Sequence, residues 1–201
     1  MILDGFQKRR EQKSKDILEA ALALFMEYGV QKVSIAEIAG KAKVSQVTIY
    51  NYFESKNQLA HEVVLYYVDQ VWNEMNEVLN SDLSYPEKIK LLIFNKKENA
   101  SQIHEDFYRY FMKEYAAGNS YIEKFYIDKA LPRLVHFFEE GKKMGYVNPN
   151  ISNEAILLYF QMFKDYLGRE EVYSKVLPIA EDLTRLCFYG IIGQTDIEQP
   201  T

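Results

Sequence analysis

The stretch that decides the fold is SIAEIAGKAKVSQVTIYNYF, residues 34–53. It opens on a capping box, in which the Ser34 hydroxyl accepts a hydrogen bond from a free amide and Glu37 reaches back to the serine amide. Ser45 can cap a second short helix, whose inward positions are Ile49 and Phe53. Two short helices joined by a tight turn predict a helix-turn-helix, with a polar and aromatic face of the second helix pointing outward.

Helices are also predicted on both sides of this stretch. Apolar residues between positions 15 and 28 follow one stripe of a 3.6-residue helix, which Gly29 ends. A further capping box, Ser55 to Gln58, opens the longest helix, which runs to about Leu79. This helix is apolar on two faces, so we expect it to join the helix-turn-helix to the rest of the chain.

The residues from Val33 to Leu59 closely resemble the DNA-binding domain of the TetR family of bacterial repressors. The matching positions are Ser34, Ile38, Ala39, Ala42, Val44, Ser45, Thr48, Ile49, Tyr50, Tyr52, Phe53, Ser55, Lys56 and Leu59. The turn departs from the family, because Lys43 stands where a left-handed glycine is usual, a change that costs about 1 kcal/mol of strain. Val47 also replaces a frequent glycine.

The resemblance implies which residues contact DNA. The set is Ser34, Lys43, Ser45, Gln46, Val47, Thr48, Tyr50, Asn51, Tyr52 and Lys56. The serine caps and the two tyrosines would hold phosphates, and Lys56, at a helix start, would clamp another. Gln46, Thr48 and Asn51 would read base edges. Val47 would either touch a thymine methyl group or pack against the neighbouring helix.

Charge is divided unevenly along the chain. The net charge is −5, yet residues 1–60 hold nine Lys and Arg against seven Asp and Glu, while residues 61–201 hold fifteen against twenty-two. A basic cluster, Lys8, Arg9, Arg10, Lys13 and Lys15, precedes the helix-turn-helix. It is either an arm that binds the DNA backbone or a solvated lead-in to the helix.

Composition excludes several classes of protein. The single Cys187 cannot form an internal disulfide, and neither a signal peptide nor an apolar run of about 20 residues is present, so we expect a cytoplasmic protein. No phosphate-binding loop, nucleophile elbow or zinc-protease motif indicates an enzyme, and we expect no cofactor and no metal. His104 with Glu105 and Asp106 could bind a metal, but an exposed helix start is the favoured explanation.

The sequence predicts an all-α fold in two parts. Residues 1–55 form the helix-turn-helix domain, and residues 56–201 form a helical domain for effector binding and dimerisation. Beyond the long helix, stretches of helix are predicted at about 87–98, 102–117, 120–131, 132–144, 153–167 and 172–190. Pro132 should kink or split the helices on either side of it.

Two features of the second part bear on function. Its many aromatic residues either line an effector pocket or form ordinary core; the ligand-binding candidates are Trp72, Met75, Phe94, Phe107 and Phe111. By the family resemblance the last two helices would form a homodimer interface, unless their apolar residues are buried within one subunit. The candidates are Leu158, Met162, Leu183, Leu186 and Tyr189.

The function hypothesis is a homodimeric transcriptional repressor that a small apolar or aromatic effector releases from a near-palindromic DNA operator. The alternative is an architectural or protein-partnered DNA-binding protein without a small-molecule effector. A buried pocket in the second part would favour the first hypothesis, and a solid core with an exposed apolar patch would favour the second.

Overall fold

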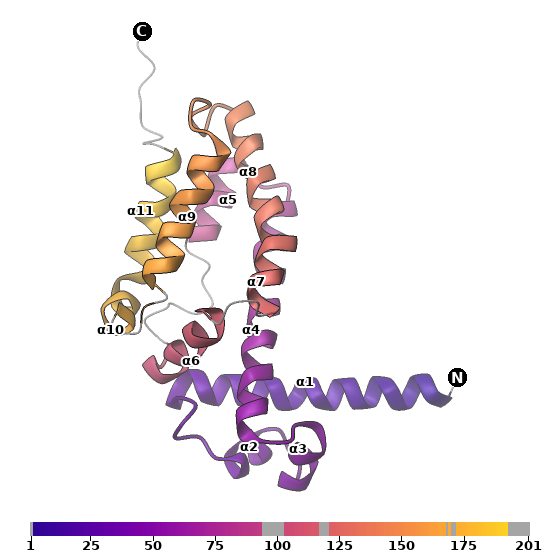
Figure 1. The fold of residues 1–201 in the computed structure, drawn as a ribbon. Coiled ribbons are helices and arrows are strands. Elements are labelled where there is room, and N and C mark those ends of the chain that lie inside the picture. The colour runs from indigo at the N-terminus through magenta and orange to yellow at the C-terminus, as the bar shows by residue number, and fades with distance from the viewer. Residues whose placement is uncertain (1, 94–102, 117–120, 168, 170–171, 193–201) are drawn as a thin grey trace.

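The structure is a computed structural model that describes residues 2–93, 103–116, 121–167, 169 and 172–192. Every regular element within these ranges is helical (Figure 1). The α-helices are α1 (Ile2–Tyr28), α2 (Ile35–Lys41), α3 (Gln46–Tyr52), α4 (Lys56–Asn80), α5 (Tyr85–Ile93), α6 (Glu105–Ala116), α7 (Tyr121–Phe125), α8 (Leu131–Lys143), α9 (Asn153–Leu167), α10 (Tyr173–Val176) and α11 (Ala180–Ile192). The predicted all-α class is confirmed.

Helices α1 to α3 and the first half of α4 enclose one hydrophobic core. Its fully buried members include Ile17, Phe25, Ile38, Ile49 and Leu59, from all four helices. These are the inward positions that the apolar periodicity predicted. In Figure 1, α1 lies across the base of the molecule with α2 and α3 beneath it, and α4 rises away from them.

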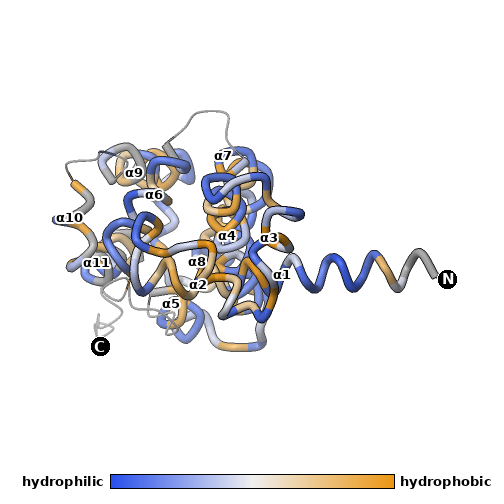
Figure 2. The backbone as a smooth tube through the Cα atoms, turned by 90° about the horizontal axis from the view of Figure 1, so that it is seen from below, coloured by the Kyte–Doolittle hydropathy of each residue, from blue (hydrophilic) through white to orange (hydrophobic). Residues whose placement is uncertain are grey.

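Helix α1 is longer than predicted, because it begins at Ile2 rather than near residue 15. Residues 2–14 contain no proline, and side-chain hydrogen bonds from Gln7 to Glu11 (3.0 Å) and from Gln12 to Asp16 (2.8 Å) link successive turns. This part of α1 projects beyond the bundle and is mainly hydrophilic (Figure 2). The basic cluster therefore lies on a regular helix.

A second core forms around the far end of α4 and involves α5, α8, α9 and α11. It contains Leu79, Tyr85, Phe137, Phe138 and Phe188. Because α4 contributes residues to both cores, it is a continuous element between the two parts of the molecule. The domain boundary expected at residue 55 falls immediately before this helix.

Pro132 has the effect predicted for it, although no loop separates the two helices. A π-helix, η2 (Tyr126–Ala130), connects α7 to α8, and the amide of Leu131 donates to the carbonyl of Tyr126, five residues earlier. Proline lacks an amide proton and crowds the preceding turn, so the regular α-helical pattern cannot continue across it.

The prediction of one helix over residues 172–190 was wrong. The structure divides this segment into α10, a 3₁₀ turn η4 (Leu177–Ile179) and α11. Pro178 lies in the 3₁₀ turn, and the same loss of an amide donor explains the interruption.

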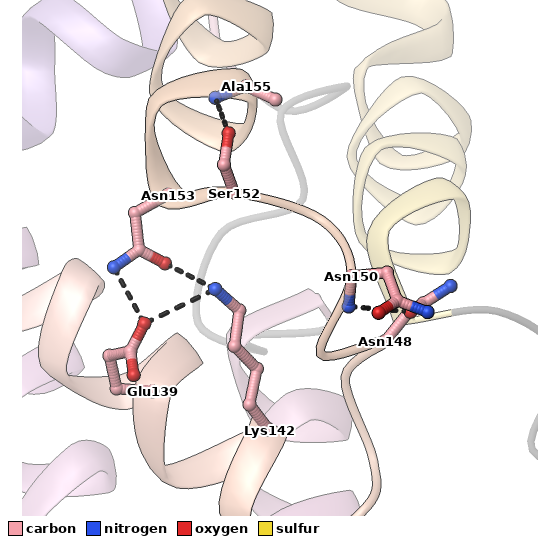
Figure 3. A network of polar contacts seen from close by, with 7 residues as sticks. All are labelled: Glu139, Lys142, Asn148, Asn150, Ser152, Asn153 and Ala155. Carbon is pink, nitrogen blue, oxygen red and sulfur yellow. Dashed lines mark hydrogen bonds and ion pairs between the residues drawn. The ribbon is translucent and has the colours of Figure 1, made fainter.

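A polar network fixes the start of α9 against the end of α8 (Figure 3). The Lys142 ammonium contacts Glu139 Oε1 at 3.2 Å and Asn153 Oδ1 at 2.7 Å, and the Asn153 amide donates to the same Glu139 oxygen at 2.7 Å. Hydrogen bonds from Asn153 and Lys142 lower the pKa of the Glu139 carboxyl. The network sets the direction of α9, which carries an exposed apolar face described below.

Candidate DNA-binding surface and interior cavity

The caps expected at α2 and α3 are both formed. Ser34 Oγ accepts from the Glu37 amide at 3.2 Å, and Glu37 Oε2 accepts from the Ser34 amide at 2.7 Å. The hydrogen bonds from Ser34 lower the pKa of Glu37, so this cap holds above the ordinary titration range of a glutamate and weakens on acidification. At α3, Ser45 Oγ accepts from the Thr48 amide at 3.0 Å.

The turn between the two helices has the strained conformation expected for it. Lys43 has a φ of 54° and is the non-glycine residue with positive φ in the described part of the chain. Its amide donates to Gly40 O at 3.3 Å, and the Val44 amide donates to Ala39 O at 3.0 Å. The left-handed residue closes the turn and leaves the Lys43 side chain exposed.

Helix α3 separates its residues onto two faces. Ile49 is buried, whereas Gln46, Val47, Tyr50 and Asn51 are exposed. Val47 is 68% exposed, so it does not pack against a neighbouring helix, which was one of its two interpretations. The exposed face carries an amide at each end and an apolar and a phenol group between them, all groups that contact base edges or phosphates.

The remaining DNA-binding candidates are more constrained. The Thr48 hydroxyl shares a hydrogen bond of 2.8 Å with the Ser45 hydroxyl, and Thr48 and Tyr52 are half-buried. Lys56 Nζ donates to the carbonyl of Gln31 at 3.0 Å, which ties the start of α4 to the turn after α1. An ammonium group has three donors, so this bond leaves Lys56 able to reach a phosphate.

An apolar cavity of about 350 Å³ lies between α4, α6, α7 and η2. It is at the lower end of the range of about 300–1,000 Å³ for ligand pockets. Four of the five ligand-binding candidates, Trp72, Met75, Phe107 and Phe111, line it. The fifth, Phe94, lies outside the described residues.

Aromatic side chains dominate the cavity wall. They are Tyr67, Trp72, Phe107, Tyr108, Phe111, Tyr115, Phe125 and Tyr126, and several meet edge to face. The described residues of the wall include no charged side chain. Other aromatic residues of the second part, such as Phe137 and Phe138, lie in the second core, and periodicity alone did not separate them from the residues of the wall.

Comparison with known proteins identifies the N-terminal part. Residues 17–63 match the family described as bacterial regulatory proteins, tetR family. The N-terminal domain of this chain is therefore a TetR-family domain. The match covers α2, the strained turn, α3 and the start of α4, which together present the exposed face of α3.

Relatives of this chain include the uncharacterized HTH-type transcriptional regulator YuxN of Bacillus subtilis, 32% identical over 52% of this chain and 35% of YuxN. The chain thus matches about a third of the length of the first curated relatives. The regulatory protein TetR from Rhodobacter sphaeroides has a TM-score of 0.60 at 16% identity, over 88% of this chain and 96% of that one. The transcriptional regulator FadR from Bacillus subtilis, solved with stearoyl-CoA, has a TM-score of 0.55 at 19% identity, over 88% and 98%. Because these similar structures cover 88% of this chain, the TetR-type fold includes both of its parts.

Sequence reasoning missed the contacts of α6 with the N-terminal domain. The His104 amide donates to Met26 O at 2.8 Å, and Asp106 Oδ2 accepts from the Gln31 amide at 2.8 Å. A Cβ on Gly29 would lie 2.8 Å from His104 Nδ1, so the glycine permits this close approach. His104 and Asp106 thus serve helix docking, and no sequence spacing signals a contact over 75 residues.

The dimer candidates occupy an apolar surface on α9 and α11, which lie side by side in Figure 1. Leu158, Met162 and Leu186 are 62–64% exposed, and Tyr189 is 45% exposed. Leu183 is half-buried. Burial within the subunit, the other interpretation of these residues, therefore does not apply to the four exposed ones.

Two features are absent from the described residues. None of the described helices is both long and apolar enough to cross a lipid bilayer. No group of three or more His, Cys, Asp or Glu side chains with metal-binding geometry is found among them.

Proposed function

We propose that this protein is a sequence-specific DNA-binding transcriptional repressor that acts as a homodimer and is released from its operator by a small apolar effector. The observation that supports it most is the exposed face of α3, which carries Gln46, Val47, Tyr50 and Asn51. Ser45 caps the start of this helix. A helix so presented can enter the major groove.

A dimer accounts for the exposed apolar surface on α9 and α11. One short helix reads few base pairs, whereas two helices related by a twofold axis read a near-palindrome with half-sites about 34–36 Å apart. Exposed leucine and methionine side chains in adjacent rows are suited to an isologous interface, in which the same surface meets itself.

The cavity supports the effector part of the proposal. Because none of the described residues of the wall is charged, an ionised ligand group placed against them would lose its hydration without gaining a counter-charge. An uncharged aromatic or aliphatic effector suits it. The FadR structure contains stearoyl-CoA, and its acyl chain is an apolar group of this kind. A cavity, rather than a solid core, also favours an effector over a protein partner.

The cavity and the DNA-binding surface share structural elements. Trp72 and Met75 of α4 line the cavity, and the same helix begins at Lys56. Phe107 lines it from α6, one residue beyond Asp106, which binds the Gln31 amide. An effector that separates these helices would therefore move both the start of α4 and the turn before α2. To release DNA it must bind the released arrangement more tightly than the DNA-bound one.

Replacing Lys56 and Gln46 singly should separate a phosphate contact from a base reader. Lys56→Ala should weaken binding to every duplex by a similar factor and reduce the slope of log K against log salt by about one. Gln46→Ala should change the preferred base within the half-site, where a bidentate pair contributes about 1–3 kcal/mol of discrimination. Fluorescence anisotropy on selected and point-mutated duplexes measures both.

Lys56→Arg is the control for the Gln31 contact, since it retains the charge and the donors. Its salt slope should equal that of the wild type. An unchanged salt slope in Lys56→Ala would show that Lys56 is only a structural link. An unchanged base preference in Gln46→Ala would show that Gln46 does not read a base.

Neutral ligands should bind the cavity better than their carboxylates. We expect naphthalene and decanol to change the fluorescence of Trp72, the only tryptophan. Naphthoate and decanoate should bind at least about tenfold more weakly, because a charge would be buried unpaired. DNA release should follow the same saturation curve as the fluorescence change. Equal binding of the acids, or saturation without any change in DNA affinity, would contradict the proposed effector class or its coupling.

A further inference from the structure

A groove next to the surface assigned above lies between the projecting part of α1 and the end of α3. Its lining residues are Phe6, Arg9, Arg10, Lys13, Asn51 and Tyr52, and its volume is about 440 Å³. We call it the α1–α3 groove. Three of these residues carry a positive charge and none carries a negative one. The basic cluster singled out in the sequence thus has a defined place beside α3.

The charge of the groove follows from the pattern of α1. Arg10, Lys13 and Ile17 follow one another at helical spacing, so they share one face of the helix. From Ile17 onward this face is apolar and buried in the first core. Where α1 leaves the core, the same face becomes cationic. Lys8 and Lys15 lie on the opposite face by the rotation of about 100° per residue, and Lys15 contacts Glu19 there at 3.7 Å.

The groove is continuous with the exposed face of α3. The Arg10 guanidinium lies over the Tyr52 ring, 5.6 Å from its centroid, which links the two helices and orients the guanidinium. Asn51 contributes to both the groove and the outward face of α3. A molecule bound along α3 would therefore pass directly into the groove.

We propose that the α1–α3 groove holds a sugar-phosphate strand of the DNA, beside the half-site that α3 reads. Arginine donates to phosphate oxygens through two parallel bonds, lysine attracts them as a point charge, and amide and phenol groups add neutral donors. All of these groups line the groove. The inference rests on the proposed function, because its ligand is the same DNA, and it adds contacts outside the major groove.

Two matched double variants test the groove. Arg9→Ala/Lys13→Ala removes two charges from the groove, and Lys8→Ala/Lys15→Ala removes two charges from the opposite face of the same helix. Arg10 is retained because it stacks on Tyr52. The probe is a duplex that the wild-type protein selects from random sequence. The first pair should lower the slope of log K against log salt by about two, and the second by less than half as much.

Hydroxyl-radical footprinting of the same duplex gives an independent readout. Arg9→Ala/Lys13→Ala should lose backbone protection beside the half-site and keep it within the half-site, and the charge-retaining pair Arg9→Lys/Lys13→Arg should restore it. Equal losses in both alanine pairs would reduce the effect to net charge and overturn the groove assignment, as would an unchanged slope and footprint in the groove pair. A wild-type protein that selects no duplex would instead refute the proposed function itself.

Discussion

Replacing Met162 and Leu186 together by glutamate should convert the protein to a monomer and lower its affinity for operator DNA by about 100-fold or more. Both side chains are more than 60% exposed on the α9 and α11 surface. In an isologous interface each substitution occurs twice across the twofold axis, so four carboxylates would be brought together in an apolar contact. Juxtaposed like charges cost several kcal/mol. Analytical ultracentrifugation and anisotropy with the selected duplex measure the two effects.

The matched control changes exposed apolar residues elsewhere. Ile127 in η2 and Met144 after α8 are 52% and 61% exposed, and their glutamate double variant should remain a dimer with wild-type DNA affinity. If Met162→Glu/Leu186→Glu also remains dimeric, the interface lies on another surface. A wild-type protein that stays monomeric at all concentrations would contradict the dimer altogether.

Gly141→Ala should destabilise the protein by about 3 kcal/mol, at the upper end of the usual cost of overpacking a core. A Cβ at this buried position would overlap the Tyr85 phenol and lie 2.7 Å from Val147 Cγ2. Tyr85 cannot move aside easily, because its ring stacks on Phe137 at 4.5 Å and on Tyr146 at 5.3 Å. For a chain of this length the change corresponds to a fall of about 6–12 °C in Tm, measurable by circular dichroism.

Gly40→Ala is the matched control, since nothing lies within 4 Å of a Cβ at that exposed helical position. It should stabilise the protein slightly, by up to about 1 kcal/mol, through its helix propensity. Tyr85→Phe distinguishes packing from polar effects. The Tyr85 hydroxyl is buried without a hydrogen-bond partner among the described residues, so removing it should leave stability unchanged or raise it. A Gly141→Ala protein as stable as the wild type would show that α8, which carries Gly141, and α5, which begins at Tyr85, separate freely at this point.

Local signals made the N-terminal domain predictable from the sequence. The capping boxes, the spacing of Ile38 and Ile49, and the glycine after α1 each act within a few residues, and each has the predicted role in the structure. The strained turn at Lys43 was expected from the family resemblance, because Lys43 stands where the TetR family usually has a left-handed glycine.

The docking of α6 and the position of the cavity depend on tertiary contacts that no local pattern encodes. The docking of Asp106 on Gln31 joins residues 75 positions apart. Helical periodicity does not distinguish Phe107, in the cavity wall, from Phe137, in the second core, since both lie on amphipathic helices. Pro178 is a local signal of the same kind as Pro132, because a proline cannot donate an amide hydrogen bond, and it accounts for the break before α11.

Selection of bound duplexes from random sequence with the wild-type protein tests most directly whether the exposed face of α3 reads DNA as one half of a dimer. We expect an enriched near-palindrome whose half-sites are centred about one helical turn apart, or a multiple of it. Recovery of unenriched sequence, or of a single asymmetric site bound by one protomer, would contradict it.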